Sequence, residues 1–227
     1  MRVYSGKSVF GGIAIGTIQV YKKGEQQVKR RKIEDVPAEI RRYRTAKQTA
    51  LEQLQNLYDK ALKEVGQANA AIFEIHQMML EDDDYNESVE NIIETQRVNA
   101  EYAVAVTEDN FAQMFASMED EYMRGRAADV RDISDRIIAN LTGNVAVQED
   151  SGEKHIICAD DLAPSETVSL DKDKVLAFVT AHGSSNSHTA ILARNMNIPA
   201  VIGVGSDFLK EVQDGLSLIH ISEPTRP

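Results

Sequence analysis

Apolar residues recur at helical spacing through the middle of the chain. Between Pro37 and Val65 the period is close to that of an amphipathic helix, in which every third or fourth residue turns to the same face. The apolar positions are Ile40, Tyr43, Ala50, Leu54, Leu57, Ala61 and Val65. Pro37 suits a first helical turn and Gly66 suits the end of the helix. The pattern therefore predicts one long helix.

The same periodicity predicts four further helices, separated by short links. They cover about 69–80, 86–97, 99–118 and 122–141, and Gly143 suits the C-cap of the last one. Helices joined by short links form bundles or paired hairpins. Residues 34–142 are therefore expected to form an all-α helical bundle.

The pattern on both sides of this block is typical of strands. Residues up to about 21 combine glycines with alternating β-branched residues in "SGKSVFGGIAIGTIQVY". Strand patterns return in "HIICADDLAPSETVSL" and "KVLAFVTA", followed by a helix after His188 and a strand in "PAVIGVG". We therefore expect a discontinuous α/β domain of residues 1–33 and 143–215, whose N-terminal strands join the same sheet, with the bundle as an insertion.

The composition of the chain mainly excludes classes of protein and kinds of site. The chain has 227 residues, no apolar run of about 18 residues and no signal-peptide core at its N-terminus. Its net charge of −11 argues against binding to nucleic acid. A single cysteine, Cys158, excludes an internal disulfide and a thiol cluster for zinc, and is expected in a buried strand. These features predict a cytoplasmic, soluble protein without a nucleic-acid or membrane partner.

Charge is unevenly distributed within the helical block. Residues 22–65 hold 12 Lys and Arg against 7 Asp and Glu, whereas residues 66–125 hold 2 against 14. Five of the seven methionines, Met78, Met79, Met114, Met118 and Met123, lie in the acidic part. An adaptable apolar patch with an acidic rim suits a basic protein partner. By composition alone, a bundle core with solvated acids explains the same residues.

The stretch "GSSNSHTAILARN" places His188 at the first turn of a predicted helix. Ser185, Asn186 or Ser187 can serve as N-cap, and Gly183 lets the backbone approach a ligand. Free N–H groups and the helix dipole at such a position favour an anion and a neutral, nucleophilic imidazole. Small-residue loops before helices are common, however, so by itself the stretch favours a histidine that merely begins a helix.

The remaining histidines suggest no separate chemistry. His76 lies on a predicted helix, His155 opens a strand, His182 lies in the loop before His188, and His220 lies near the C-terminus. No His or Cys pair has metal-ligand spacing, and the chain contains no Walker loop or nucleophile elbow. The role of His182 is left open.

Several stretches, in the same order, resemble one known family. The histidine stretch, read on as "GSSNSHTAILARNMNIPAVIG", resembles the phosphohistidine signature of the phosphoenolpyruvate-utilising enzymes. Two helical stretches, "AAIFEIHQMMLEDDDY" and "DEYMRGRAADVRDISDRI", are similar to the helical insertion of Enzyme I of the bacterial sugar phosphotransferase system. The loop "ADDLAPSET" is similar to the strand and loop beside its active site. The resemblance covers about residues 5–215.

The resemblance implies a swivelling α/β phosphohistidine domain with an inserted helical subdomain. His188 would carry a phosphoryl group on Nε2, received from phosphoenolpyruvate and passed to a histidine of the phosphocarrier HPr, the first step of sugar uptake by this system. Thr167 matches the position whose hydroxyl contacts and orients the active histidine. The helical subdomain would bind HPr through Met78, Met79, Asp82, Asp84, Phe115, Tyr122 and Arg126.

The family also has a C-terminal barrel that binds phosphoenolpyruvate and Mg²⁺ and makes the homodimer. This barrel has no counterpart in the present chain, so we expect no metal site here and a monomer. Residues 216–227 do not resemble the family and are expected to be a non-native tail. Two alternatives remain: the mobile domain of a dikinase-like enzyme, and a non-catalytic module that docks a partner.

Overall fold

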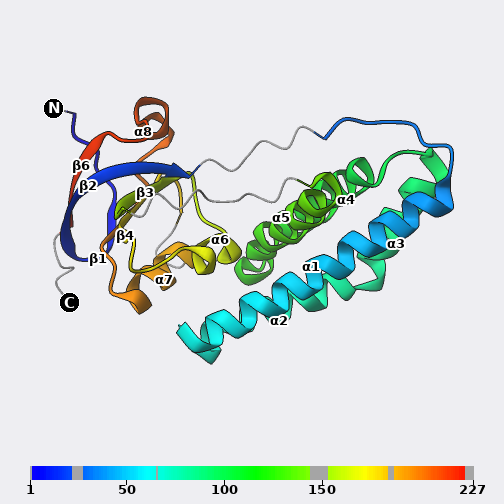
Figure 1. Ribbon diagram of the computed structural model, residues 1–227, viewed down its shortest axis with the longest axis horizontal. Helices are drawn as coiled ribbons and strands as arrows, with labels where there is room; N and C mark the ends of the chain where they lie inside the picture. Colours follow the sequence, from blue (N-terminus) through cyan, green and yellow to red (C-terminus); the bar gives the residue numbers. More distant parts are fainter. Residues whose placement is uncertain (1, 22–27, 65, 144–152, 184–186, 223–227) are drawn as a thin grey trace. The chain divides into compact units, whose positions relative to one another are not determined.

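A computed structural model describes residues 2–21, 28–64, 66–143, 153–183 and 187–222. The chain divides into two compact units, Met1–Gly24 with Glu149–Pro227, and Glu25–Gln148 (Figure 1). The first unit contains the strands and three short helices, and the second contains the long helices α1 to α5. The first unit is thus assembled from both ends of the chain. None of the helices within the described ranges is long and apolar enough to cross a membrane.

The first unit is built on a mixed sheet in the strand order β1-β5-β4-β3-β2-β6. The strands are β1 (Lys7–Phe10), β2 (Gly12–Tyr21), β3 (His155–Ala159), β4 (Val175–Thr180), β5 (Ala200–Ile202) and β6 (Ser217–Ser222). Strands β2, β3, β4 and β5 pair in parallel, and β1 and β6 pair antiparallel at the two edges. The prediction that the N-terminal strands join the C-terminal ones in one sheet is confirmed.

Alternating strand residues supply two apolar cores, one on each face of this sheet. On one face Ile157 and Phe178 pack with Ala193 of α7 (His188–Met196). On the other face Ile156 and Cys158 pack with Phe208 of α8 (Ser206–Glu211). Figure 1 shows α8 on one side of the sheet and α7 on the other. The period of two along each strand therefore decides which helix each residue meets.

Cys158 is fully buried in β3, as expected. Burial raises the pKa of its thiol to about 12. The thiol therefore stays protonated at neutral pH, which removes it as a nucleophile.

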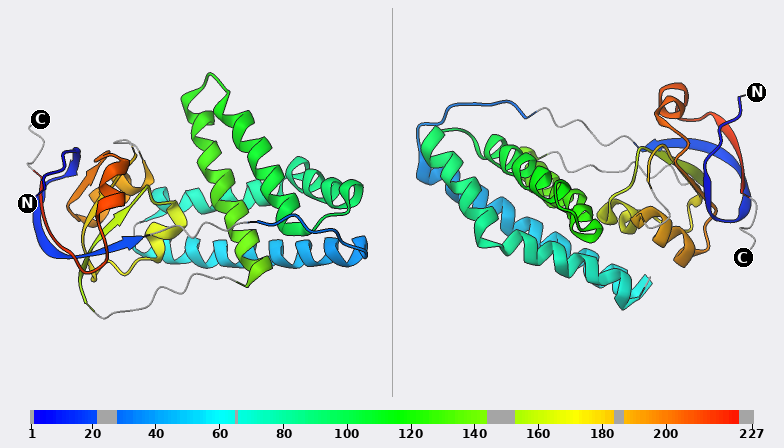
Figure 2. Two further views of the ribbon diagram at one scale, coloured as in Figure 1. Left: turned by 90° about the horizontal axis from the view of Figure 1, so that it is seen from above. Right: turned by 180° about the vertical axis from the view of Figure 1, so that it is seen from behind.

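The second unit is a helical bundle whose helices match the predicted ones closely. They are α1 (Val36–Glu64), α2 (Gln67–Glu81), α3 (Asp83–Gln96), α4 (Ala100–Ala116) and α5 (Glu121–Thr142). Helix α1 packs along α2 and is crossed by α5, and α4 packs along α5 (Figure 2). Tyr43, Ala50, Leu54 and Ala61 of α1 are fully buried, which confirms the helical spacing read from the sequence. Val65 lies outside the described residues.

Left-handed backbone conformations separate these helices where a chain reversal requires them. Gly66 has φ of 85° before α2, and Gly143 has φ of 72° as the C-cap of α5. Arg97 ends α3 with φ of 53°, a conformation that is uncommon for a residue other than glycine. The predicted roles of the two glycines are confirmed.

Three elements differ from the sequence-based expectations. The strand pattern read across "HIICADDLAPSETVSL" holds only for β3, because Pro164–Ser169 forms a short helix, α6. Helix α8 was not predicted at all. Residues 217–222, set apart in the sequence as part of a tail, form the edge strand β6 against β2. The non-native origin of residues 216–227 stays a prediction.

Candidate functional site

The loops that follow the parallel strands meet at one edge of the sheet. Ala181 N donates to Ala159 O at 3.0 Å, and His182 N donates to Asp160 O at 2.8 Å. The chain after β5 joins them, because Gly205 N donates to Ala181 O at 3.0 Å. This is the edge formed by the carboxyl ends of the parallel strands, where α/β sheets usually bind ligands.

Helix α7 begins at this edge with His188 as its first residue. Ser187 is the N-cap, and its side-chain oxygen accepts from Ala190 N at 3.3 Å. Of the three expected caps, Ser187 is thus the one used, while Ser185 and Asn186 lie outside the described residues. The backbone of His188 is described, but its side chain is not.

Gly183 turns the chain into this loop with φ of 111°, a conformation that favours glycine. A Cβ atom at Gly183 would lie 3.5 Å from each of three side-chain oxygens, on Asp161, Thr180 and Ser187. The residue predicted from the sequence to allow a close backbone approach is therefore also required by the turn itself.

Asp161 joins the loop after β3 to the first turn of α7. Its Oδ1 accepts from Leu162 N at 2.9 Å and from the Thr189 hydroxyl at 3.1 Å. Thr189 is fully buried. Sequence reasoning missed both residues. The available signals were an acidic residue just after a buried strand and a threonine directly after His188.

Thr167 lies in α6 and is only 2% exposed. Its hydroxyl donates to the backbone carbonyl of Pro164 at 2.8 Å. The hydroxyl proton is therefore engaged within α6, and toward another group the oxygen can act only as an acceptor. Helix α6 packs against α7, the helix that begins with His188.

The residues expected to bind a partner lie at neighbouring ends of α2, α3, α4 and α5. Met78 is 67% exposed and Tyr122 is 66% exposed. Asp82 and Asp84 are also exposed, and Met79, Phe115 and Arg126 are half-buried. We call these seven residues the Met–Asp face.

Three members of the Met–Asp face, Asp82, Arg126 and Tyr122, also have structural partners. Asp82 is the N-cap of α3, and its carboxylate accepts from Tyr85 N at 3.0 Å. Arg126 pairs with Asp129 at 3.1 Å, donates to the Tyr122 hydroxyl and lies over the Tyr122 ring. The position of Arg126 is therefore fixed within its own helix.

A buried histidine joins α2 to α5 one helical turn from this face. His76 is fully buried, with Nε2 3.3 Å from Asp129 and Nδ1 3.4 Å from Asp132. Met79 follows His76 by one turn, and Arg126 precedes Asp129 by one turn, so this contact holds the two parts of the face together. Sequence reasoning assigned His76 to a helix only. The sequence feature that could have indicated this contact is the pair of aspartates, three residues apart on one helix.

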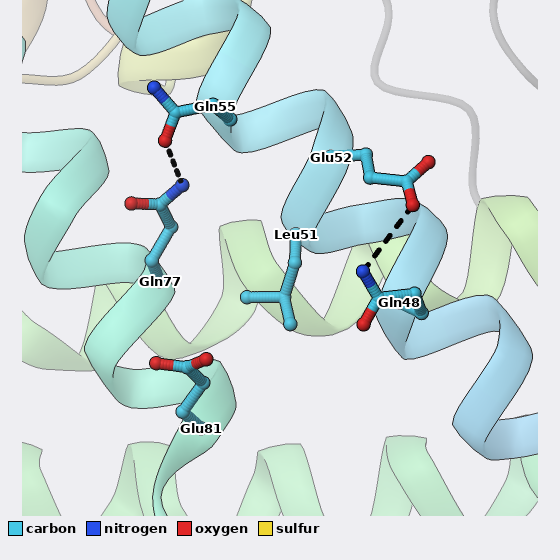
Figure 3. Close-up of a pocket in the computed structure, with 6 residues that line it drawn as sticks. All are labelled: Gln48, Leu51, Glu52, Gln55, Gln77 and Glu81. Carbon is cyan, nitrogen blue, oxygen red and sulfur yellow. Dashed lines mark hydrogen bonds between the residues drawn. The ribbon is translucent and has the colours of Figure 1, made fainter.

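A polar groove lies between α1 and α2 (Figure 3). It is lined by Gln48, Leu51, Glu52, Gln55, Gln77 and Glu81. Gln77 Nε2 donates to Gln55 Oε1 at 3.1 Å, and Gln48 donates to Glu52 at 3.3 Å. These side chains include no histidine, so the groove has no imidazole that could accept a phosphoryl group. Among the described residues, no cluster of His, Cys, Asp and Glu could hold a metal ion.

Known sequence families match most of the chain. Residues 5–126 match "PEP-utilising enzyme, N-terminal", and residues 151–221 match "PEP-utilising enzyme, mobile domain". A phosphoenolpyruvate-protein phosphotransferase from Bacillus sp. (strain S) is 38% identical over 92% of this chain and 36% of its own length. The protein of the same name from Bacillus subtilis is 38% identical over 96% of this chain and 38% of its own length. The chain thus spans little more than a third of these relatives.

Solved structures agree with these matches. A solution structure of "Enzyme I (nEIt)" has a TM-score of 0.76 and 39% identity, and the alignment covers 96% of this chain and 89% of that one. A structure described as the N-terminal domain of "Enzyme 1 - Nitrogen" has a TM-score of 0.64 at 24% identity, which supports the fold alone.

Proposed function

Because the chain belongs to the phosphoenolpyruvate-utilising enzymes, and within them to the Enzyme I family, we propose that His188 carries a phosphoryl group in exchange with the phosphocarrier HPr. The observation that carries the proposal is the position of His188 as the first residue of α7, at the carboxyl edge of the parallel strands. Free N–H groups at a helix N-terminus suit the phosphoryl oxygens, and the helix dipole favours the neutral ring.

The transfer step requires one bond to form as another breaks. The lone pair on Nε2 of neutral His188 attacks phosphorus, and the P–N bond to the HPr histidine breaks as its electron pair returns to that ring. The reverse step regenerates phospho-HPr. The hydrogen bonds that Asp161 accepts from Thr189 and Leu162 would keep the first turn of α7 in position during this exchange.

Thr167 would orient the ring by accepting a hydrogen bond. Its hydroxyl proton is already donated to Pro164, so only the oxygen lone pairs remain for His188. An acceptor beside Nδ1–H selects the tautomer whose Nε2 is unprotonated, which is the nucleophilic form.

The Met–Asp face would bind HPr. Exposed Met78 and Tyr122 offer an apolar centre, and Asp82 and Asp84 offer negative charge at the rim. Apolar and aromatic side chains hold a complex together, whereas rim charges mainly raise the rate of encounter. A basic surface on the carrier would complement this arrangement.

Phosphoenolpyruvate and Mg²⁺ would act through the part of the longer relatives that this chain does not span. Phosphoryl transfer from phosphoenolpyruvate needs cations around the moving group. Mg²⁺ would supply that charge in the full-length homodimer, which we place in the cytoplasm.

The proposal is tested by labelling the chain with ³²P from phospho-HPr. We expect acid-labile label on the wild-type chain and none on His188→Ala, with circular dichroism of the variant unchanged. Labelling from phospho-HPr that is undiminished in His188→Ala would refute the assignment.

A further inference from the structure

Three side chains at the carboxyl edge of the sheet form a hydrogen-bonded chain centred on His182. Asp160 Oδ1 lies 2.7 Å from His182 Nδ1, and the Ser206 hydroxyl lies 3.1 Å from His182 Nε2. The three residues come from the segments that follow β3, β4 and β5. The His182 side chain is 58% exposed and that of Asp160 is 69% exposed, so the ring is open to solvent.

The two partners fix which ring nitrogen is nucleophilic. A carboxylate can only accept, so Nδ1 carries a proton that it donates to Asp160. Nε2 of the neutral ring then has a free lone pair, which accepts from the Ser206 hydroxyl. A carboxylate on the far nitrogen also stabilises the positive charge that the ring gains when Nε2 forms a new bond. This is the arrangement of an activated nucleophilic imidazole.

We propose that His182 is a second phosphoryl-accepting residue, reactive through Nε2 toward small phosphoramidate donors that reach it from solvent. In the step, Nε2 attacks phosphorus, the P–N bond of the donor breaks, and the electron pair leaves with the donor nitrogen. The imidazolium formed on His182 passes its Nδ1 proton to Asp160 or to water. Ser206, released from Nε2, can donate its hydroxyl to a phosphoryl oxygen. This site goes beyond the proposed function, because it needs neither His188 nor HPr.

Two other histidines of the same chain serve as internal comparisons. His155 is partly exposed, and its Nδ1 lies 2.9 Å from the hydroxyl of Thr17. His76 is fully buried between two aspartates. His182 combines exposure with a carboxylate on Nδ1 and should therefore react faster than either.

The test uses potassium phosphoramidate, a small donor with a P–N bond, on the 227-residue chain carrying His188→Ala. Phosphorylation of each histidine is followed by mass spectrometry, and the substituted nitrogen is identified by NMR. We expect His182 to be phosphorylated on Nε2 at least about tenfold faster than His155, a difference of about 1.4 kcal/mol in barrier. Asp160→Asn should bring the His182 rate down to about that of His155.

The rate at His155 in the same Asp160→Asn sample shows whether the fold is intact. Equal phosphorylation rates at His182 and His155 in the chain that keeps Asp160 would overturn the proposal. A phosphorylation rate at His182 that is unchanged by Asp160→Asn would also overturn it. Neither result bears on labelling of His188 by phospho-HPr, so failure here and failure of the proposed function are distinguishable.

Discussion

At the scale of single residues, the hydrogen bonds a side chain already makes limit what it can do next. Thr167 illustrates this, because its hydroxyl proton is engaged by Pro164 and its side chain is almost fully buried. Cys158 is a second case, since burial raises the pKa of its thiol and keeps it protonated. The sequence identified both residues, but only the structure shows the direction in which each can act.

Thr167→Val tests the orienting role of the hydroxyl. The variant keeps the shape of the side chain and removes the acceptor, so we expect phosphoryl exchange with HPr to slow by about 10- to 100-fold, or about 1.4–2.7 kcal/mol in barrier. Thr167→Ser keeps the hydroxyl and should remain close to the wild-type rate. Rapid-quench labelling measures both, and a wild-type rate for Thr167→Val would show that the hydroxyl is not needed.

The residues that sequence reasoning missed depend on contacts between distant positions. Ser187 and Gly183 could be predicted because capping and tight turns are local properties. The bond from Asp161 to Thr189 links positions 28 residues apart, and no periodic pattern reports such a contact. The link from His76 to Asp129 and Asp132 was missed for the same reason.

At the scale of elements, the length of a helix determined whether the spacing of apolar residues in the sequence could predict it. Helices α1 to α5 span three or more turns each, long enough for the helical period to emerge. Helices α6 and α8 have six residues each and show no such period. Local bonds stabilise α6 instead, with Pro164 in its first turn and the Glu166 carboxylate accepting from Ala163 N at 2.7 Å.

The buried contact between α2 and α5 should be important for stability of the helical unit. His76→Leu removes this contact, while Asp129 keeps its pair with Arg126. We expect the free energy of unfolding to fall by about 1–3 kcal/mol, the usual cost of losing a partner for a buried polar group. Urea unfolding followed by helical circular dichroism measures the loss. Gln67→Leu, at an exposed position of the same helix, serves as a control and should change little.

A double-mutant cycle separates this contact from simple loss of packing. If His76 and Asp132 interact, the effects of His76→Leu and Asp132→Asn should deviate from additivity by about 0.5–3 kcal/mol. Strictly additive effects would show that the two side chains do not stabilise each other.

The Met–Asp face allows charge and apolar contact to be tested separately. Replacing Met78 and Met79 with Ala should raise the dissociation rate of HPr by about tenfold, because apolar side chains at an interface centre hold the complex. Replacing Asp82 and Asp84 with Asn should instead lower the association rate and flatten its dependence on salt. Asparagine at position 82 still caps α3, so the helix is retained.

Surface plasmon resonance at several salt concentrations gives both rate constants. Association that does not depend on salt in the wild-type chain would mean that the acidic residues do not face the carrier. Unchanged dissociation of the methionine variant would remove these side chains from the interface.

At the scale of the whole molecule, the order of elements along the chain explains why the two units could be recognised from sequence. The strand pattern stops near Tyr21 and resumes near His155, and β2 pairs in parallel with β3 across this interval. The change from a strand pattern to a helical pattern and back therefore indicated the inserted helical unit correctly. The edge strand β6 was not foreseen, since its pairing with β2 depends on where the returning chain reaches the sheet.

The last prediction concerns the choice of phosphoryl donor. Transfer requires donor and acceptor in line, with cations balancing the charge on the moving group. The arginine-rich stretch "RGRAADVRD" lies on helix α5, where Arg126 is paired with Asp129. With phospho-HPr as donor, the Met–Asp face would bind the carrier and His188 at the start of α7 would accept the phosphoryl group. We therefore expect the 227-residue chain to exchange label reversibly with HPr and to remain unlabelled by phosphoenolpyruvate, with or without Mg²⁺. Parallel labelling from the two donors, with His188→Ala as the blank, decides the question, because robust labelling from phosphoenolpyruvate alone would require a donor site within these residues.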